Sequence, residues 1–152
     1  RIEGLNNNKP DLFIIDLNLN IKKKLSLFKQ NRKRKIYIVT SVTKNNKILY
    51  LKKIGLKIIN IKSLKTNEDF INLFMILRKR GYNRTLVESG LTFLNVLINK
   101  KLIFNLYMFK SSFNLGKNGK NNSTNKILKK LTLKKRIKVN LYNDNLFVTK
   151  IK

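Results

Sequence analysis

The sequence predicts an α/β protein: a three-layer sandwich whose mostly parallel sheet ends in a C-terminal antiparallel hairpin. Short runs of β-branched residues alternate with stretches of helical periodicity along most of the chain. The run at residues 11–16 is apolar between its flanking charges, which is typical of a strand buried on both faces of a parallel sheet. Two further runs flank a turn-forming stretch near the C-terminal end. The 152 residues are expected to form one domain, or part of one, with a sizeable core.

Three strands and a helix are expected in the first part of the chain. The strands are DLFIID at residues 11–16, KIYIVTS at 35–41 and LKIINI at 56–61. Residues 17–30 alternate loosely and then become basic, so we interpret them as a turn. A short helix at 46–54 stops at Gly55, because glycine readily takes the left-handed conformation that ends helices.

The strongest helix signal follows the third strand. Thr66 or Asn67 caps this helix, and Glu68 and Asp69 occupy its first turn, where the helix dipole favours negative charge. Basic residues 78–80 fill the last turn, and Gly81 ends it. The apolar side chains recur at the spacing that builds one helix face. They are Phe70, Leu73, Phe74 and Leu77.

Residues 81–101 combine a strand, a glycine-containing turn and a helix start. Residues 85–87 (Thr-Leu-Val) are expected to form a short buried strand, which leads through Glu88, Ser89 and Gly90 into a helix at 91–102. The free N–H groups and the dipole of a helix start attract anions, and glycine lets a phosphate approach the backbone. The alternative is a connection that simply needs a glycine.

The remaining elements are a strand at 103–109, a long Gly-, Asn- and Ser-rich loop at 111–125, and a hairpin. The hairpin strands are expected at 136–141 and 146–151. Open α/β sheets bind ligands at the carboxyl ends of their strands. There, Thr40 and Ser41 either bind a 2′-phosphate or cap their strand, and Asp16 either faces the ligand or caps the following turn.

Composition excludes several kinds of chemistry. Cysteine and histidine are both absent, so disulfides, thiolate catalysis, a Ser-His-Asp triad and the usual zinc sites are excluded, and no metal site is expected. No apolar run approaches the roughly 18 residues of a membrane span, and no signal peptide opens the sequence. A cytoplasmic protein fits this composition.

The formal net charge of +28 would ordinarily indicate a nucleic-acid partner. However, lysines are spread over every segment together with Asn and Ile, the residues that A/T-only codons specify. Interleaving of Arg with aromatic residues, which stacks bases, is missing along the chain. A nucleic-acid partner is therefore unlikely, although a basic nucleic-acid-binding domain is kept as an alternative.

The motif LVESGLTFLNVLINKKLIFNLYMFKSSFNLG resembles the "LVEGGptLa..ll..glvDel.ly.aP.llG" pattern of a known family. The family is the reductase domain of bifunctional riboflavin-biosynthesis deaminase–reductases, a relative of dihydrofolate reductase. KPDLFIIDLNLNI and KIYIVTS are similar to two further family segments, so the resemblance covers essentially the whole chain. It implies a dihydrofolate-reductase-like fold and NADPH-dependent reduction of 5-amino-6-(5-phosphoribosylamino)uracil to the ribitylamino compound.

The resemblance also implies roles for individual residues. Arg1, at the end of the family's "aDdPqLtvR" segment, and Glu88 would contact the phosphorylated pyrimidine substrate. Leu17 stands where the family usually has a cofactor-contacting Ser, so only a backbone contact could persist there. The turn and first helical residues would surround the cofactor phosphates. They are Gly90, Leu91, Thr92, Phe93, Leu94, Asn95 and Val96.

The chain departs from the family pattern in several places. Ser89 replaces the second family glycine, Asn105 or its neighbour replaces an Asp, and the proline before "llG" is lacking. The first reductase strand is expected to precede Arg1, so residues 1–152 would be the C-terminal part of the reductase domain. A parent protein would then carry the zinc deaminase upstream. A truncated, inactive reductase-like domain is an alternative, and a homodimer is possible.

Overall fold

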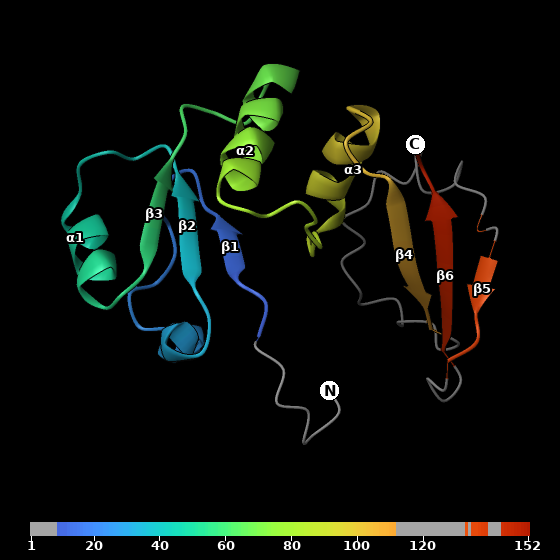
Figure 1. The fold of residues 1–152 in the computed structure, drawn as a ribbon, viewed down its shortest axis with the longest axis horizontal. Coiled ribbons are helices and arrows are strands. Elements are labelled where there is room, and N and C mark those ends of the chain that lie inside the picture. The colour runs from blue at the N-terminus through green and yellow to red at the C-terminus, as the bar shows by residue number, and fades with distance from the viewer. Residues whose placement is uncertain (1–8, 112–132, 134, 140–143) are drawn as a thin grey trace, which may run out of the picture. The chain divides into compact units, whose positions relative to one another are not determined.

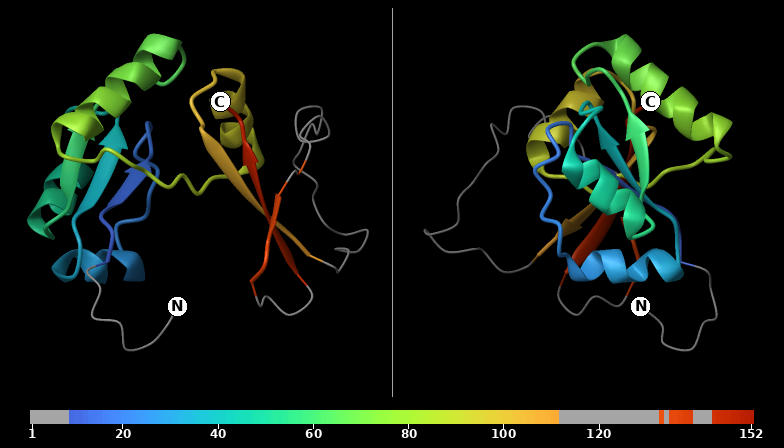
Figure 2. Two further views of the ribbon diagram at one scale, coloured as in Figure 1. Left: turned by 45° about the vertical axis from the view of Figure 1, so that its right-hand side comes forward. Right: turned by 90° about the vertical axis from the view of Figure 1, so that its left-hand side faces the viewer.

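A computed structural model describes residues 9–111, 133, 135–139 and 144–152 of the chain. It divides into two compact units, residues 1–84 and 85–152, and each is described by itself. Figure 1 shows the elements of both units, and Figure 2 gives two further views. The predicted loop at 111–125 lies outside the described residues except for Ser111, and so do residues 142 and 143 of the predicted hairpin turn.

The first unit is built on a parallel sheet of three strands in the order β1-β2-β3. Its strands are β1 (Leu12–Ile15), β2 (Ile36–Thr40) and β3 (Lys57–Asn60), close to the predicted positions. Ile38 of the central strand pairs with Ile14 on one side and with Ile58 on the other. Every residue of β2 is buried. The apolar run at 11–16 was predicted to be buried on both faces, and this prediction is wrong: none of the residues of β1 is buried and Ile15 is 41% exposed, because β1 stands at the edge of this sheet.

Alternate residues of β2 enter two separate hydrophobic cores. Ile36 and Ile38 pack with Ile48 and Leu51 of helix α1 (Asn46–Lys53) in one core. Tyr37 and Val39 pack in the other with residues of helix α2 (Asn67–Lys79), among them Leu73 and Leu77. Because successive side chains of a strand point to opposite faces, the two helices cover opposite faces of the sheet. The first unit is thus a three-layer α/β sandwich.

The capping of α2 at its start, and the glycines that follow α1 and α2, agree with the sequence prediction. The Thr66 side chain accepts from the Asp69 N–H, and the Asp69 carboxylate accepts from the Thr66 N–H, which together form a capping box. Hydrogen bonds from the Ser63 hydroxyl and from backbone N–H groups lower the pKa of Asp69 to about 2. Gly55 and Gly81 follow the helices with φ of 89° and 91°, the left-handed region.

An aromatic cluster ties the end of the first unit to its first strand. The Phe13 ring stacks on Tyr37 with centroids 4.5 Å apart, and Tyr82 meets Phe13 edge-on at 4.8 Å. The Tyr82 hydroxyl donates to the Asp11 carboxylate, which also accepts from the Lys35 N–H at 2.8 Å. Residues at the two ends of the unit's sequence are therefore held together.

The stretch at 17–30, which we interpreted as a turn, contains part of a 3-10 helix. This element, η1 (Ser26–Arg32), places Phe28 in the core with Leu19. No acidic residue lies in its first turn, and no side chain caps it. The sequence did not predict this element, because the residues around its one buried aromatic side chain are rich in lysine and show no helical periodicity.

The second unit holds helix α3 and an antiparallel sheet of three strands in the order β4-β6-β5. The helix is α3 (Leu91–Asn99), and the strands are β4 (Asn105–Lys110), β5 (Lys135–Ile137) and β6 (Asn145–Lys150). The predicted hairpin is confirmed by the pairing of β5 with β6, in which Lys135 faces Val148. Together the units confirm the α/β class, with a parallel and an antiparallel sheet.

The predicted buried strand at residues 85–87 is wrong. These residues form no regular element; Leu86 is 78% exposed and Val87 42% exposed. The parallel and antiparallel strands accordingly belong to two separate three-stranded sheets, whereas a single sheet was predicted. A strand needs backbone partners as well as suitable residues, and no described strand pairs with this stretch.

Candidate functional site

The start of α3 is the part of the predicted site that the structure describes most fully. Gly90 is its N-cap, with φ of −68° and ψ of 163°, and no side chain caps the helix. No acidic residue occupies its first turn. The positive end of the helix dipole therefore has no neutralising side chain beside it in the first turn. By contrast, Asn45 caps α1 and Thr66 caps α2.

Gly90 leaves open space in front of the helix start. A Cβ added to this residue would meet no heavy atom within 4 Å. Its φ is one that any residue adopts, so backbone conformation does not require a glycine here. The backbone at this position is therefore accessible from outside the helix.

The predicted cofactor-contacting residues of α3 differ in exposure. Thr92 is exposed, and Leu91, Phe93, Leu94 and Val96 are half-buried. The side-chain oxygen of Asn95 is buried and accepts no hydrogen bond. An unsatisfied buried acceptor costs about 1–3 kcal/mol, and a donor on a ligand would remove that cost. The open glycine and the helix start without a side-chain cap fit a phosphate-bearing cofactor.

Glu88 lies two residues before the N-cap of α3, in the exposed segment that precedes the helix. Its carboxylate makes no hydrogen bond or ion pair within the described part of the chain. An exposed carboxylate without a partner is free to accept hydrogen bonds from a substrate.

In the first unit, the polar groups at the carboxyl ends of β1 and β2 bond to one another. The Leu17 carbonyl accepts from the Thr40 hydroxyl at 2.9 Å, the Ser41 hydroxyl at 2.8 Å and the Ser41 N–H at 3.0 Å. Thr40 is fully buried. Of the two roles predicted for the Thr40 and Ser41 hydroxyls, the structure shows the strand cap. The Leu17 backbone carbonyl is the acceptor for both hydroxyls.

Asp16 caps the turn that follows β1. Its two carboxylate oxygens accept from the Asn20 N–H at 3.0 Å and from the Ile21 N–H at 2.7 Å. Within this turn, Leu19 has a φ of 56° and is buried in the core, and the Lys47 ammonium donates to its carbonyl at 2.6 Å. Of the two roles predicted for Asp16, the turn cap is the one observed.

The predicted site residues fall in both units. Leu17 belongs to the first unit, Glu88 and residues 90–96 belong to the second, and Arg1 lies outside the described residues. The buried side-chain oxygen of Asn95 was not predicted. Its one signal in the sequence is that Asn95 is the single amide in the otherwise apolar stretch FLNVLI.

No helix in the described part of the chain combines the length and apolar character needed to cross a bilayer. Within the same residues, no three His, Cys, Asp or Glu side chains are grouped so that they could hold a metal ion.

Comparison with protein families identifies the chain. The model of the RibD C-terminal domain matches residues 2–145, which is nearly the whole sequence. The chain belongs to the RibD C-terminal domain family. No match to a curated protein was found. The RibD C-terminal domain is the reductase-type domain of riboflavin biosynthesis, so the chain is a reductase-type domain of this pathway, and its α/β fold agrees with that family.

Proposed function

We propose that this domain carries out the NADPH-dependent reduction of 5-amino-6-(5-phosphoribosylamino)uracil to 5-amino-6-(5-phosphoribitylamino)uracil. The match to the RibD C-terminal domain over residues 2–145 supports a reductase of riboflavin biosynthesis. The observation that carries the cofactor assignment is the open, uncapped start of α3 at Gly90. The free N–H groups and the dipole at this helix start favour binding of a phosphate group of the cofactor.

The residues of this chain contribute binding and orientation to the proposed reaction. The cofactor, when bound, supplies a hydride. The ribosyl C1 gains this hydride, its bond to the ring oxygen breaks, and that oxygen gains a proton, which opens the sugar ring to the ribityl chain. The first N–H groups of α3 would hold cofactor phosphates, while Glu88 accepts hydrogen bonds from the ribosyl or uracil groups and so positions C1.

NADPH binding to the 152-residue chain tests the cofactor site, with calorimetry or cofactor fluorescence as the measurement. We expect Gly90→Val to weaken binding about tenfold or more, because displacing a phosphate from even one N–H removes about 1.5 kcal/mol or more. Gly90→Ser separates binding from folding. A serine N-cap stabilises the helix, yet its side chain fills the phosphate position, so we expect higher stability and weaker binding.

Glu88→Gln is the matched variant for the substrate role. It keeps the size of the side chain and removes its charge, so NADPH binding should persist while the KM for the pyrimidine substrate rises. NADPH binding that is equally strong in the parent chain and in both Gly90 variants would contradict the assignment of α3. Loss of NADPH binding in Glu88→Gln would contradict the separation of the cofactor and substrate roles.

A further inference from the structure

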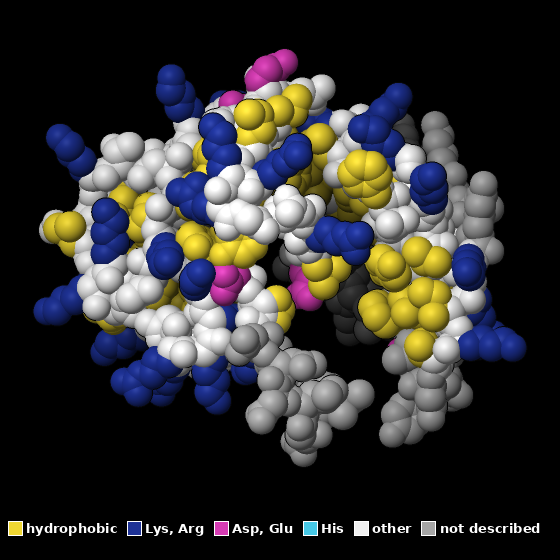
Figure 3. All heavy atoms as spheres, viewed as in Figure 1, with side chains coloured by type: hydrophobic (Ala, Val, Ile, Leu, Met, Phe, Trp, Pro, Cys, Tyr) yellow, Lys and Arg dark blue, Asp and Glu magenta, His cyan; other side chains and the backbone are white. Residues whose placement is uncertain are grey.

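The antiparallel sheet of the second unit has one face that carries exposed aromatic rings. In β4, Leu106 is buried, whereas Tyr107 is 53% exposed and Phe109 is 66% exposed. Alternate residues of a strand share a face, so these two rings lie on the same side, about 6.8 Å apart along the strand. Figure 3 shows hydrophobic side chains gathered over β4 with basic side chains beside them.

The strand register adds two lysines and three apolar residues to this face. Tyr107 lies opposite Val148, which in turn lies opposite Lys135. In the same way, Asn105 lies opposite Lys150. Directly opposite residues point to the same side of an antiparallel pair. The resulting surface is called the open face below. It consists of Asn105, Tyr107, Phe109, Lys135, Ile137, Leu146, Val148 and Lys150.

We propose that the open face binds single-stranded nucleic acid. Exposed rings on a sheet give unpaired bases a surface on which to stack, and nearby ammonium groups neutralise the phosphates that join those bases. Lys135 and Lys150 are both exposed, and they belong to the two strands that follow β4 in the sheet, Lys150 on β6 opposite Asn105 and Lys135 on β5 in line with Tyr107 and Val148. The overall excess of 35 basic over 7 acidic residues adds a long-range attraction for any polyanion.

The positive charge of the open face favours single-stranded nucleic acid over a second copy of the chain as its partner. Two copies meeting through the open face would bring their lysines together in a protein that already carries a net charge of +28. A single strand of nucleic acid instead offers negative charge and flat apolar surfaces in alternation. The linear sequence does not show the arrangement, because its basic and aromatic members come from three different strands. It uses residues other than those of the proposed reductase site.

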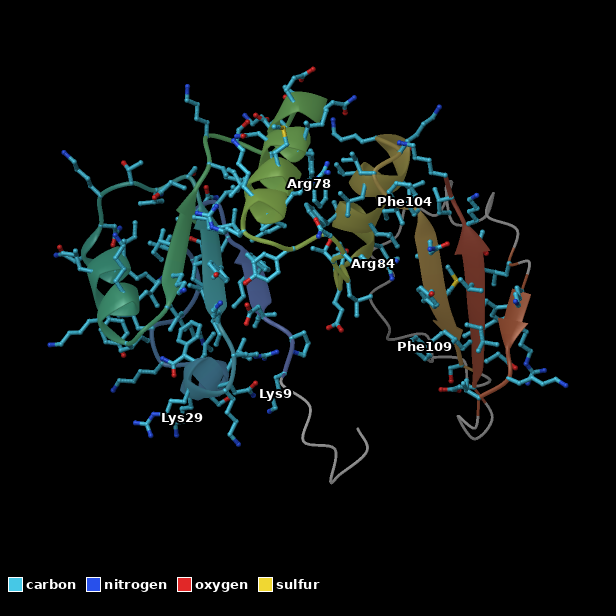
Figure 4. The ribbon with its side chains drawn as sticks, in the orientation of Figure 1. Lys9, Lys29, Arg78, Arg84, Phe104 and Phe109 are labelled. Carbon is cyan, nitrogen blue, oxygen red and sulfur yellow. The ribbon has the colours of Figure 1, made fainter. Side chains whose placement is uncertain are left out.

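Titration of fluorescently labelled twelve-residue oligouridylate and oligothymidylate with the 152-residue protein tests the proposal. We expect both to bind, and we expect the double variant Tyr107→Ala, Phe109→Ala to bind about fivefold or more weakly. Tyr107→Phe keeps a stacking ring and should keep the affinity. Phe104→Ala is the matched control, because Phe104 is 64% exposed in the same unit but lies before β4, beside the Lys152 ammonium. Figure 4 shows Phe104 and Phe109 near opposite ends of β4.

The salt dependence tests the contribution of the lysines. For Lys135→Gln with Lys150→Gln, the slope of log K against log salt should fall in magnitude by about 1.4, since each phosphate contact to a single strand contributes about 0.7. Lys62→Gln with Lys65→Gln removes the same charge from exposed positions in the first unit and should leave the slope unchanged. A preference for one of the two oligonucleotides would identify RNA or DNA as the partner.

Three outcomes would overturn the proposal. The first is that neither oligonucleotide binds at low salt while far-UV circular dichroism shows a folded protein. The second is an equal loss of affinity in the Phe104 control and in the open-face double variant. The third is a concentration-dependent dimer that the Tyr107 and Phe109 substitutions abolish, because a second copy would then occupy the face. None of these results bears on NADPH binding, which Gly90 tests separately.

Discussion

Removing one hydroxyl group, in the variant Tyr82→Phe, should measurably destabilise the first unit. Tyr82 follows α2, and its hydroxyl donates to Asp11, 71 residues earlier in the chain, just before β1. Phenylalanine keeps the ring that meets Phe13 edge-on, so the aromatic contact is preserved. The substitution therefore isolates the hydrogen bond that joins the two ends of the unit.

The geometry sets the size of the effect. A hydrogen bond to a charged acceptor contributes about 1.5–3 kcal/mol. Asp11 keeps its bond from the Lys35 N–H at 2.8 Å, and both Asp11 and Tyr82 are only half-buried, so the lower end of that range applies. We expect a loss of about 1.5 kcal/mol, which lowers the unfolding midpoint by roughly 3–6 °C for a chain of this size.

Urea and thermal unfolding, followed by circular dichroism, provide the measurement. Tyr37→Phe is the control, because it removes only the longer contact of 3.3 Å between the Tyr82 and Tyr37 hydroxyls and should cost less. Asp11→Asn completes a double-mutant cycle with Tyr82→Phe, in which a coupling energy of about 1 kcal/mol or more is expected. A Tyr82→Phe protein as stable as the parent, or a cycle without coupling, would refute this reasoning.

The hydrogen bond between Tyr82 and Asp11 also predicts how stability depends on pH. Burial acts to raise the pKa of Asp11, but hydrogen bonds from Tyr82 and the Lys35 N–H, with the charges of Lys35 and Lys57, outweigh it and lower that pKa below 3.8. The contribution of the carboxylate is thus present above pH 3.8 and disappears as the pH falls further. Burial and the bond to Asp11 raise the pKa of Tyr82 above 10. The contribution of the protonated Tyr82 hydroxyl to stability is therefore complete below pH 10 and declines above it. Tyr82→Phe should remove this alkaline decline.

Three further comparisons test the packing and the helix ends of the first unit. Leu51→Ala, at a fully buried position of α1, should cost about 2–5 kcal/mol in urea unfolding, whereas Leu49→Ala, at a position 66% exposed, should change stability by less than about 0.5 kcal/mol. Gly81→Ala should cost about 1–2 kcal/mol for its left-handed backbone. Gly55→Ala should cost more, since its Cβ would lie 2.8 Å from the side-chain nitrogen of Asn31, which donates to the Ile54 carbonyl and would have to move. Asp69→Asn should reduce the stability change that the parent shows between pH 3.8 and about 2, measured by acid unfolding, and should leave the part that comes from Asp11.

The sequence predicted those elements whose signals are local. Helix α2 was predicted well because Thr66, Asp69 and Gly81 mark its ends by side-chain and backbone chemistry that operates within a few residues. Strand β2 was predicted because its β-branched residues favour an extended backbone that packs on both sides. The stretch at 85–87 has the composition of a strand but has no pairing partner among the described strands, and pairing is a property of the fold.

The site shows the same division between local and long-range information. The start of α3 at Gly90 was predicted to the residue, since a glycine before an apolar periodic stretch is a local signal. The bonds from Thr40 and Ser41 to the Leu17 carbonyl join residues 23 and 24 positions apart. Sequence alone left two roles for these hydroxyls, because only the register of β1 on β2 determines what lies within their reach.

The strand orders have a consequence for folding during synthesis. In the first unit the spatial order β1-β2-β3 follows the order in which the strands leave the ribosome, so each new strand meets an existing neighbour. Among the described strands of the second unit, β4 and β5 are joined through β6, the last of the three to be made. The exposed rings of β4 therefore lie on a strand whose described partner has not yet been made, and chaperone binding or aggregation would compete with folding during this interval.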